Sequence, residues 1–286
     1  MELCNIHDLR ELLSRHDFHF SKAKGQNFLV APWVPERIAE ESGANKGSGV
    51  LEIGPGVGCL TERLARCAGR VVAVELDKRL LPVLGETMAG HSNVEIVNGD
   101  IMKLDLVSLV SEKLSGLSPA VCANLPYNIT TPVLTRLMDA GFFTDITVMI
   151  QKEVAQRICA LPGSSDYGAF SVYVNFHAVP EILFDVPPGC FEPKPKITSS
   201  VIRLRMRSAP PVSCNESLFF RVVRASFAQR RKTLLNGLSA AFSPLLSKEQ
   251  LSAVILSCGF DGRVRGETMG IQEFAALTNA LEGYLP

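Results

Sequence analysis

Several common sequence features are scarce or absent in this chain of 286 residues. No apolar run reaches the roughly 18 residues that a membrane-spanning helix needs. The eight cysteines are scattered and none forms a CxxC pair, so neither a zinc site nor a disulfide framework is indicated. The first 18 residues have a polar, helical pattern without the apolar core of a signal peptide. We therefore expect a cytoplasmic protein with reduced cysteines, no membrane contact and no bound metal.

An excess of charge is also missing, because 29 basic residues balance 29 acidic ones. A zero net charge argues at first against a nucleic-acid partner. The charges are unevenly distributed, however: residues 187–240 contain two acidic and ten basic residues, a net charge of +8. A neutral protein with such a region can still bind phosphates, although a solvated helix face would give the same pattern. The ten basic residues are Lys194, Lys196, Arg203, Arg205, Arg207, Arg221, Arg224, Arg230, Arg231 and Lys232.

Short apolar runs rich in Val and Ile alternate with helical patterns from about residue 50 to residue 151. The runs are GVLEIG, RVVAVEL, NVEIVNGD, PAVCANLP and DITVMIQ. This alternation predicts an α/β fold with a doubly wound, Rossmann-like parallel sheet. Two further segments, AFSVYVNFHA (169–178) and SSVIRLRM (199–206), follow without a clear helix between them. We expect them to form an antiparallel strand pair at the sheet edge.

A proline-containing stretch, SAPPV at 208–212, is expected to be a linker, because proline ends regular structure. The chain beyond it has helical patterns throughout, including an unbroken one over residues 217–242. The sequence therefore predicts a catalytic α/β domain over residues 1–207 and a small C-terminal helical domain over residues 208–286.

A glycine-rich loop, Gly54-Pro-Gly56-Val-Gly58, follows the first of these strands and precedes a helix. Glycines at this place let the backbone approach a ligand beyond the carboxyl ends of the strands. The third glycine of a dinucleotide fingerprint would fall at Cys59, so the spacing here is GxGxG. This spacing favours S-adenosylmethionine over a nicotinamide cofactor, which remains the alternative.

Acidic residues end the next two strands. Glu75 is placed to accept hydrogen bonds from both ribose hydroxyls of a cofactor, and Asp100 to accept one from its adenine amine. Each residue taken alone could instead cap the following helix. Three successive strand ends that are acidic or rich in glycine are harder to explain as caps, and they strengthen the prediction of a cofactor site.

The sequence Asn124-Leu125-Pro126-Tyr127 ends the fourth strand. An adenine amine is a poor nucleophile because its lone pair is delocalised into the ring. The Asn124 side-chain oxygen and the Leu125 carbonyl are two acceptors that can hold its N–H groups and direct the lone pair toward a methyl donor. Tyr127 offers a face for base stacking, and Pro126 stiffens the turn. These residues predict methyl transfer to an adenine amine.

The motifs GQNFL, EIGPGVG, VELD, NGDI and NLPYNITTP resemble those of the small-subunit ribosomal RNA adenine dimethyltransferases, the kasugamycin-resistance family. FEPKPKITSSV and FAQRRKTL extend the resemblance over about residues 15–285. Departures are mild: Ile197 and Ser200 stand where Val and Ala are more usual. The resemblance implies an S-adenosylmethionine site formed by Gln26, Asn27, Leu29, Gly54, Gly56, Glu75, Leu76, Asp100, Ile101 and Asn124, with Gln26 near the cofactor carboxylate.

The same resemblance implies transfer of two methyl groups to each of two adjacent adenosines near the 3′ end of 16S rRNA. Phe191 would lie on the opposite face of the target base from Tyr127. The helical domain would bind RNA, and the partner would be a pre-30S particle bound by a monomer in the cytoplasm. RNA contacts are expected from Lys194, Lys196, Arg224, Arg230, Arg231 and Lys232.

Two other functions remain open at this point. The related enzymes that dimethylate large-subunit rRNA and confer macrolide resistance share the glycine loop, the acidic residues and an Asn-x-Pro-Tyr motif. Leu125, the following TTP and the arginine-rich helical tail favour the small-subunit family. A ribosome-assembly factor that keeps the fold without catalysis is the alternative from another class, and the intact motif at 124–127 argues against it.

Overall fold

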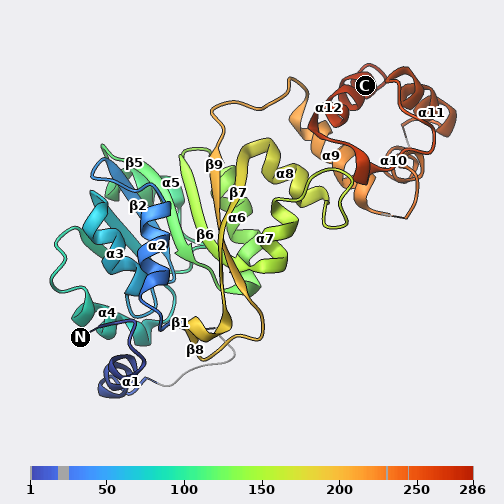
Figure 1. Ribbon diagram of the computed structural model, residues 1–286. Coiled ribbons are helices and arrows are strands. Elements are labelled where there is room, and N and C mark those ends of the chain that lie inside the picture. Colours follow the sequence, from blue (N-terminus) through green and yellow to red (C-terminus); the bar gives the residue numbers. More distant parts are fainter. Residues whose placement is uncertain (1, 19–25, 230, 244, 286) are drawn as a thin grey trace. The chain divides into compact units, whose positions relative to one another are not determined.

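The computed structural model describes residues 2–18, 26–229, 231–243 and 245–285 (Figure 1). The chain forms two compact units. Unit 1 comprises Met1–Ala155 and Glu181–Met206, and unit 2 comprises Gln156–Pro180 and Arg207–Pro286. In the described ranges, no helix has both the length and the apolar character needed to cross a membrane.

Unit 1 is built on a seven-stranded sheet with the strand order β4-β3-β2-β5-β6-β9-β7. The first five of these strands are parallel, and β9 runs antiparallel to β6. The strands span Ser48–Ile53 (β2), Arg70–Glu75 (β3), Val94–Asn98 (β4), Ser118–Asn124 (β5), Asp145–Gln151 (β6), Ala178–Val186 (β7) and Ser199–Met206 (β9). The five strands expected between residues 50 and 151 are therefore confirmed, together with the Rossmann-like α/β fold.

Continuous apolar runs form these strands because the inner strands of a parallel sheet are covered on both faces. All six residues of β2 are buried, and so are five of the six in β3. The strand order reverses between β2 and β5, so the carboxyl ends of these two strands lie side by side. A reversal of this kind is where doubly wound sheets bind ligands.

Seven helices in the described residues belong wholly or partly to unit 1, and α2 and α3 lie side by side among them (Figure 1). The seven are Ile6–Arg15 (α1), Trp33–Glu41 (α2), Cys59–Cys67 (α3), Leu81–Thr87 (α4), Leu106–Lys113 (α5), Thr130–Asp139 (α6) and Lys152–Ile158 (α7). A separate two-stranded sheet pairs Phe28–Leu29 (β1) with Phe191–Glu192 (β8).

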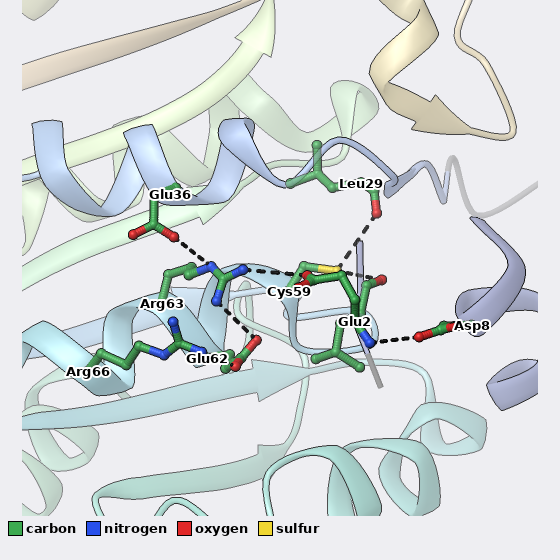
Figure 2. A network of polar contacts seen from close by, with 9 residues as sticks. Glu2, Asp8, Leu29, Glu36, Cys59, Glu62, Arg63 and Arg66 are labelled. Carbon is green, nitrogen blue, oxygen red and sulfur yellow. Dashed lines mark hydrogen bonds and ion pairs between the residues drawn. The ribbon is translucent and has the colours of Figure 1, made fainter. Parts of the chain in front are cut away.

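Arg63 of α3 ties the N-terminal segment to α2 and α3 (Figure 2). Its side chain is only 9% exposed, and its guanidinium group lies 2.8 Å from Glu36 of α2 and 3.4 Å from Glu2. The thiol of Cys59, the first residue of α3, lies within hydrogen-bond distance of the carbonyls of Leu3 (3.3 Å) and Leu29 (3.7 Å), either of which can accept its single proton. These contacts fix β1 and the start of α3 to one another.

The predicted strand at 169–178 is wrong, because Ala169–His177 forms a helix, α8. The aromatic and β-branched residues that suggested a strand pack at helical spacing: Phe170 stacks on Tyr173, and Tyr173 contacts His177. Phe176 packs against Phe219 of the same unit, and this tertiary contact outweighs local strand propensity. The antiparallel strand expected at 199–206 is confirmed as β9 next to β6, and β7 forms the sheet edge instead of 169–178.

Unit 2 is helical and contains Glu216–Phe227 (α9), Leu234–Phe242 (α10), Lys248–Ser257 (α11) and Ile271–Glu282 (α12) in addition to α8. The expected unbroken helix over 217–242 is wrong, because a turn separates α9 from α10. A Cβ atom on Gly237 would lie 2.4 Å from the Ala225 carbonyl oxygen. The chain therefore has to turn back so that the two helices approach closely at this glycine.

The two compact units differ from the predicted domains of residues 1–207 and 208–286 in one segment. Residues 156–180 belong to unit 2 rather than to the sheet-containing unit. Tyr167, Val172 and Phe176 of this segment are buried in the same hydrophobic cluster as Phe219 and Phe274. The other boundary between the units follows Met206, one residue before the predicted division after residue 207.

Candidate functional site

The glycine-rich loop leaves the carboxyl end of β2 in a conformation that only glycine adopts easily. Gly54, Gly56 and Gly58 have φ angles of 69°, 62° and 96°, all in the left-handed region. Gly58 forms the N-cap of α3, so the loop runs directly into a helix N-terminus. A Cβ atom on Gly56 would lie 3.3 Å from the Phe28 ring. The loop therefore exposes backbone rather than side chains at the end of the sheet.

Glu75 holds this loop from the end of β3. It is buried, and its carboxylate accepts the backbone N–H of Gly56 (3.3 Å) and that of Asp77 (2.7 Å). Burial raises the pKa of Glu75, and these backbone hydrogen bonds oppose the rise. Asp77 rather than Glu75 caps the short helix Lys78–Leu80, because it accepts the N–H of Arg79. Glu75 is therefore not explained as a helix cap.

Asp100 follows β4, and one of its oxygens accepts the backbone N–H of Met102 at 2.9 Å. The alternative role of Asp100, as a cap of the turn that follows it, thus accounts for only one of its two carboxylate oxygens. The other oxygen lies 3.9 Å from Lys103 Nζ, which is an exposed and weak contact. Asp100 therefore keeps acceptor capacity toward a ligand.

Asn124 ends β5 beside the glycine loop. Its side-chain Nδ2 donates to the Asn27 carbonyl at 3.4 Å, so the amide is turned with its donor toward Asn27. The Leu125 side chain is buried, and its backbone N–H donates to the Met149 carbonyl of β6 at 3.1 Å. These contacts hold the turn and leave the Asn124 Oδ1 atom for another donor.

Tyr127 follows in the short helix Tyr127–Ile129 and is half-buried. Its hydroxyl lies 2.7 Å from the hydroxyl of Ser199, which is fully buried at the start of β9. Burial raises the pKa of Tyr127, so the phenol is neutral at physiological pH. The ring is thus fixed at both ends, by the backbone turn and by β9.

These residues surround one cavity of about 340 Å³ at the carboxyl ends of the strands, a size typical of small-molecule sites. A second cavity of about 40 Å³ shares part of its wall. Of the predicted residues, the larger cavity is lined by Gln26, Asn27, Gly54, Gly56, Glu75, Leu76, Asp100, Ile101, Asn124, Leu125, Pro126 and Tyr127. Leu29 lines only the smaller one.

Phe191, predicted to lie at the target base, is a core residue in the structure. It is 1% exposed, lies in the hydrophobic core and is not among the residues that line either cavity. The reason is the pairing of β8 with β1, which sets Phe191 opposite Leu29. The predicted role of Phe191 on the opposite face of the target base from Tyr127 stays a prediction.

The basic residues expected to contact RNA are exposed where the structure describes them. Lys194 and Lys196 lie in unit 1, and Arg224, Arg231 and Lys232 lie in unit 2. Arg230 lies outside the described residues. Four other members of the basic region are engaged within their own unit: Arg203 and Arg205 pair with Glu181, Arg207 donates to the Asn175 carbonyl and Arg221 to the Ala241 carbonyl.

Sequence reasoning missed three residues that shape the site. Phe28 and Asp77 line the larger cavity, and Glu52 lines the smaller one. Asp77 receives a hydrogen bond from Gln26 at 3.1 Å. An acidic residue two positions after Glu75 was the available signal for Asp77. No comparable signal in the sequence pointed to Phe28 or Glu52, because each stands among apolar strand residues.

Comparison with known proteins places this geometry in a family. The family model described as ribosomal RNA adenine dimethylase matches residues 17–265. The ribosomal RNA small subunit methyltransferase A of Geobacillus thermodenitrificans is 45% identical over 276 residues, which cover 95% of this chain and 94% of the relative. The protein of the same name from Lachnoclostridium phytofermentans is 46% identical over 275 residues, with 95% of each chain covered.

Solved structures agree in fold. A dimethyladenosine transferase from Plasmodium falciparum superimposes with a TM-score of 0.76 at 23% identity, covering 87% of this chain and 95% of its own. The 23S rRNA methyltransferase ErmE gives a TM-score of 0.69 at 26% identity, covering 90% of this chain and 100% of its own. With the family match over most of its length, this chain belongs to the ribosomal RNA adenine dimethylase family of methyltransferases.

Proposed function

We propose that this protein transfers methyl groups from S-adenosylmethionine to the amines of two adjacent adenosines near the 3′ end of 16S rRNA. The observation that carries the proposal is the position of the Asn124–Tyr127 turn. It forms one wall of the cavity whose other walls are the glycine loop, Glu75 and Asp100. A methyl donor and an acceptor amine would thus meet at the end of β5.

The cavity walls fit the charge of S-adenosylmethionine, which has one net positive charge. Glu75, Asp77 and Asp100 line the larger cavity, and no described residue lining it is basic. Buried oxygens without a partner add to the fit, since Gln26 Oε1 and Glu52 Oε2 accept no hydrogen bond within the described residues. Such orphaned acceptors are expected where a ligand supplies the donors.

Each wall of the cavity is assigned to one part of the cofactor from the chemistry of its side chains. Glu75 would accept the ribose hydroxyls with the acceptor capacity that Gly56 and Asp77 leave, and Asp100 would accept the adenine amine. Leu76 and Ile101 would cover the faces of the adenine, and Leu76 is 64% exposed for an apolar residue. The remaining residues proposed to hold the methionine end are Gln26, Asn27, Leu29, Gly54, Gly56 and Asn124.

When bound, the cofactor supplies a methyl group activated by a sulfonium. The chain's own part is to align the amine. Asn124 Oδ1 is directed away from Asn27 and would accept one N–H, while the Leu125 carbonyl would accept the other. Holding both hydrogens favours the tetrahedral nitrogen of the transition state without a strong base. Tyr127 would stack on the base, and Pro126 holds the turn.

RNA binding is assigned to the exposed basic residues, and unit 2 is proposed as the RNA-binding domain. Arg224, Arg231 and Lys232 have no ion-pair partner in the described part of the chain, in contrast to Arg203 and Arg205. Unpaired surface cations release counterions when they meet phosphates. We also propose that Lys194 and Lys196 contact phosphates, and that a monomer acts on a pre-30S particle in the cytoplasm.

The large-subunit alternative receives less support. ErmE is 26% identical to this chain, whereas the relatives named as small-subunit methyltransferases are 45–46% identical. A non-catalytic assembly factor is also disfavoured, because the turn and its supporting hydrogen bonds are intact.

Tritiated methyl transfer into purified ribosomal particles that lack the modification tests the proposal. The expected result is incorporation into 30S particles at two adjacent adenosines and none into 50S particles. Asn124→Ala is the catalytic control and should incorporate far less label. Preferred labelling of 50S particles would overturn the small-subunit assignment, and no labelling of either particle would support the assembly-factor alternative.

A further inference from the structure

Ser199 is a buried serine at the start of β9 whose hydroxyl group reaches the candidate site. The residue is 0% exposed, and its hydroxyl lies 2.7 Å from the hydroxyl of Tyr127, which lines the larger cavity. Among the described residues, Tyr127 is the one hydrogen-bond partner of this hydroxyl. A buried hydroxyl is unfavourable unless it forms a hydrogen bond. Ser199 therefore depends on Tyr127 for its hydrogen bond, and it holds the tip of the Tyr127 ring in return.

The two ends of Tyr127 are held by neighbouring strands of one sheet. The turn before the ring is held by β6, because the Leu125 N–H donates to the Met149 carbonyl at 3.1 Å. The tip of the ring is held by β9 through Ser199. These two strands pair directly, with Gln151 of β6 opposite Ser199 of β9. The backbone and the hydroxyl of Tyr127 are thus attached to the same pair of strands.

The hydrogen bond at the hydroxyl restricts a motion that the backbone turn leaves free. The hydroxyl lies at the far end of the ring, so holding it limits rotation about the first side-chain torsion and keeps the ring in the cavity wall. A side chain that is already ordered does not have to be ordered when its ligand binds. A fixed Tyr127 ring would therefore lower the cost of binding a base and help to align the amine of that base with Asn124.

We propose that Ser199 is a positioning residue for methyl transfer, because it holds the Tyr127 ring in the orientation that receives the target base. The inference rests on the proposed function, which takes Tyr127 as the stacking partner of the base. Ser199 is not among the described residues that line either cavity, so it does not itself meet the cofactor or the base. Its effect on the reaction is transmitted through the Tyr127 hydroxyl.

Ser200, the next residue of β9, provides a matched control. It is also 0% exposed, and its hydroxyl donates to the Asp185 carboxylate of β7 at 2.6 Å. Successive side chains of a strand point to opposite faces of the sheet, so the Ser200 hydroxyl points away from the face on which Ser199 meets Tyr127. Ser199→Ala and Ser200→Ala each remove one buried hydroxyl and its hydrogen bond from the same strand. Only the first substitution affects the hydrogen bond to Tyr127.

Steady-state methylation of 30S particles by the full-length protein tests the assignment, with the KM for the particle and kcat measured separately. We expect Ser199→Ala to raise this KM about three- to ten-fold, from the cost of ordering one side chain on binding, and to lower kcat less. The affinity for S-adenosylmethionine, measured by calorimetry, should stay within about two-fold of wild type. Ser200→Ala should leave KM, kcat and the cofactor affinity unchanged.

A double-mutant cycle identifies the route of the effect. Tyr127→Phe removes the same hydrogen bond from its other end and keeps the ring. If Ser199 acts through Tyr127, the double variant should have about the same KM as either single variant. An unchanged KM in Ser199→Ala, effects that add in the double variant, or equal changes in Ser199→Ala and Ser200→Ala overturn the positioning role and leave the proposed function intact. If the wild-type protein does not methylate 30S particles, the proposed function itself is wrong, and the two failures are distinguishable.

Discussion

Replacing Glu52 by Gln is expected to stabilise the cofactor-free protein at neutral and alkaline pH. The pKa of Glu52 is raised from its ordinary value of 4.5 to about 8. Between these values the unfolded chain has lost this proton while the folded chain still holds it. The free energy of unfolding therefore falls as the pH rises through this window, by about 1.4 kcal/mol for each pH unit. Gln at this position has no proton to retain and does not suffer the loss.

The stability of the Gln variant relative to wild type should thus grow with pH. From pH 5 to pH 8 the difference should increase by about 3 kcal/mol, because Glu52 is fully buried and little screened by solvent. Urea unfolding of both proteins across this pH range measures it, with the transition of unit 1 followed separately if the two units unfold independently. Subtracting the two curves cancels the other titrating groups, except for the influence of Glu52 on Glu75.

A constant difference between pH 5 and pH 8 would refute the reasoning. It would mean that Glu52 is ionised in the folded protein, with a cationic or hydrogen-bonding partner in the cofactor-free state. Glu112→Gln, which removes the same charge from an exposed side chain, is the matched control. Urea slopes that stay equal between variant and wild type would confirm that the comparison concerns the same unfolding transition.

The sheet could be predicted from the sequence because its signals are local. Inner parallel strands are covered on both faces, so each gives a continuous Val- and Ile-rich run ended by Gly or an acidic residue. The carboxyl ends of such strands converge on one edge, which brings Gly54, Glu75, Asp100 and Asn124 together without any knowledge of distances. These four residues do line one cavity.

The failures arise where contacts between distant segments decide the structure. The segment 169–177 has a strand-like composition, but its aromatic residues contact one another at helical spacing, and Phe176 packs against Phe219. The turn between α9 and α10 depends on the close approach at Gly237. The burial of Phe191 in the core likewise depends on the pairing of β8 with β1, two segments far apart in the sequence.

Charge counting had a related limit. Residues 187–240 contain ten basic residues, yet Arg203, Arg205, Arg207 and Arg221 bind acceptors within their own unit. Sequence alone cannot separate such engaged cations from those open to a phosphate. Glu52 is an example of the opposite problem. In the sequence it is a single polar residue in the apolar run GVLEIG. Only the structure sets it apart, because its Oε2 atom is buried and accepts no hydrogen bond from the described residues.

Three further predictions concern the transfer itself. Tyr127→Phe keeps the ring but removes the hydroxyl that meets β9, so it should cost about 1 kcal/mol of stability and raise the KM for RNA more than it lowers kcat. Replacing Arg231 and Lys232 together by Gln should flatten the salt dependence of 30S binding, whereas Lys248→Gln, an exposed cation elsewhere in unit 2, should not. Asn124→Ala should lower the single-turnover rate by about 10²–10³-fold, since it removes a preorganised acceptor, and should change cofactor affinity much less. The second transfer gives the sharper expectation: a monomethylated amine has one N–H left, and without Asn124 only the Leu125 carbonyl can hold it. Both steps should slow, and nucleoside mass spectrometry of mono- and dimethyladenosine follows each. Wild-type rates for both steps in the Ala variant would show that Asn124 only supports the turn through Asn27, and the alignment mechanism would fail.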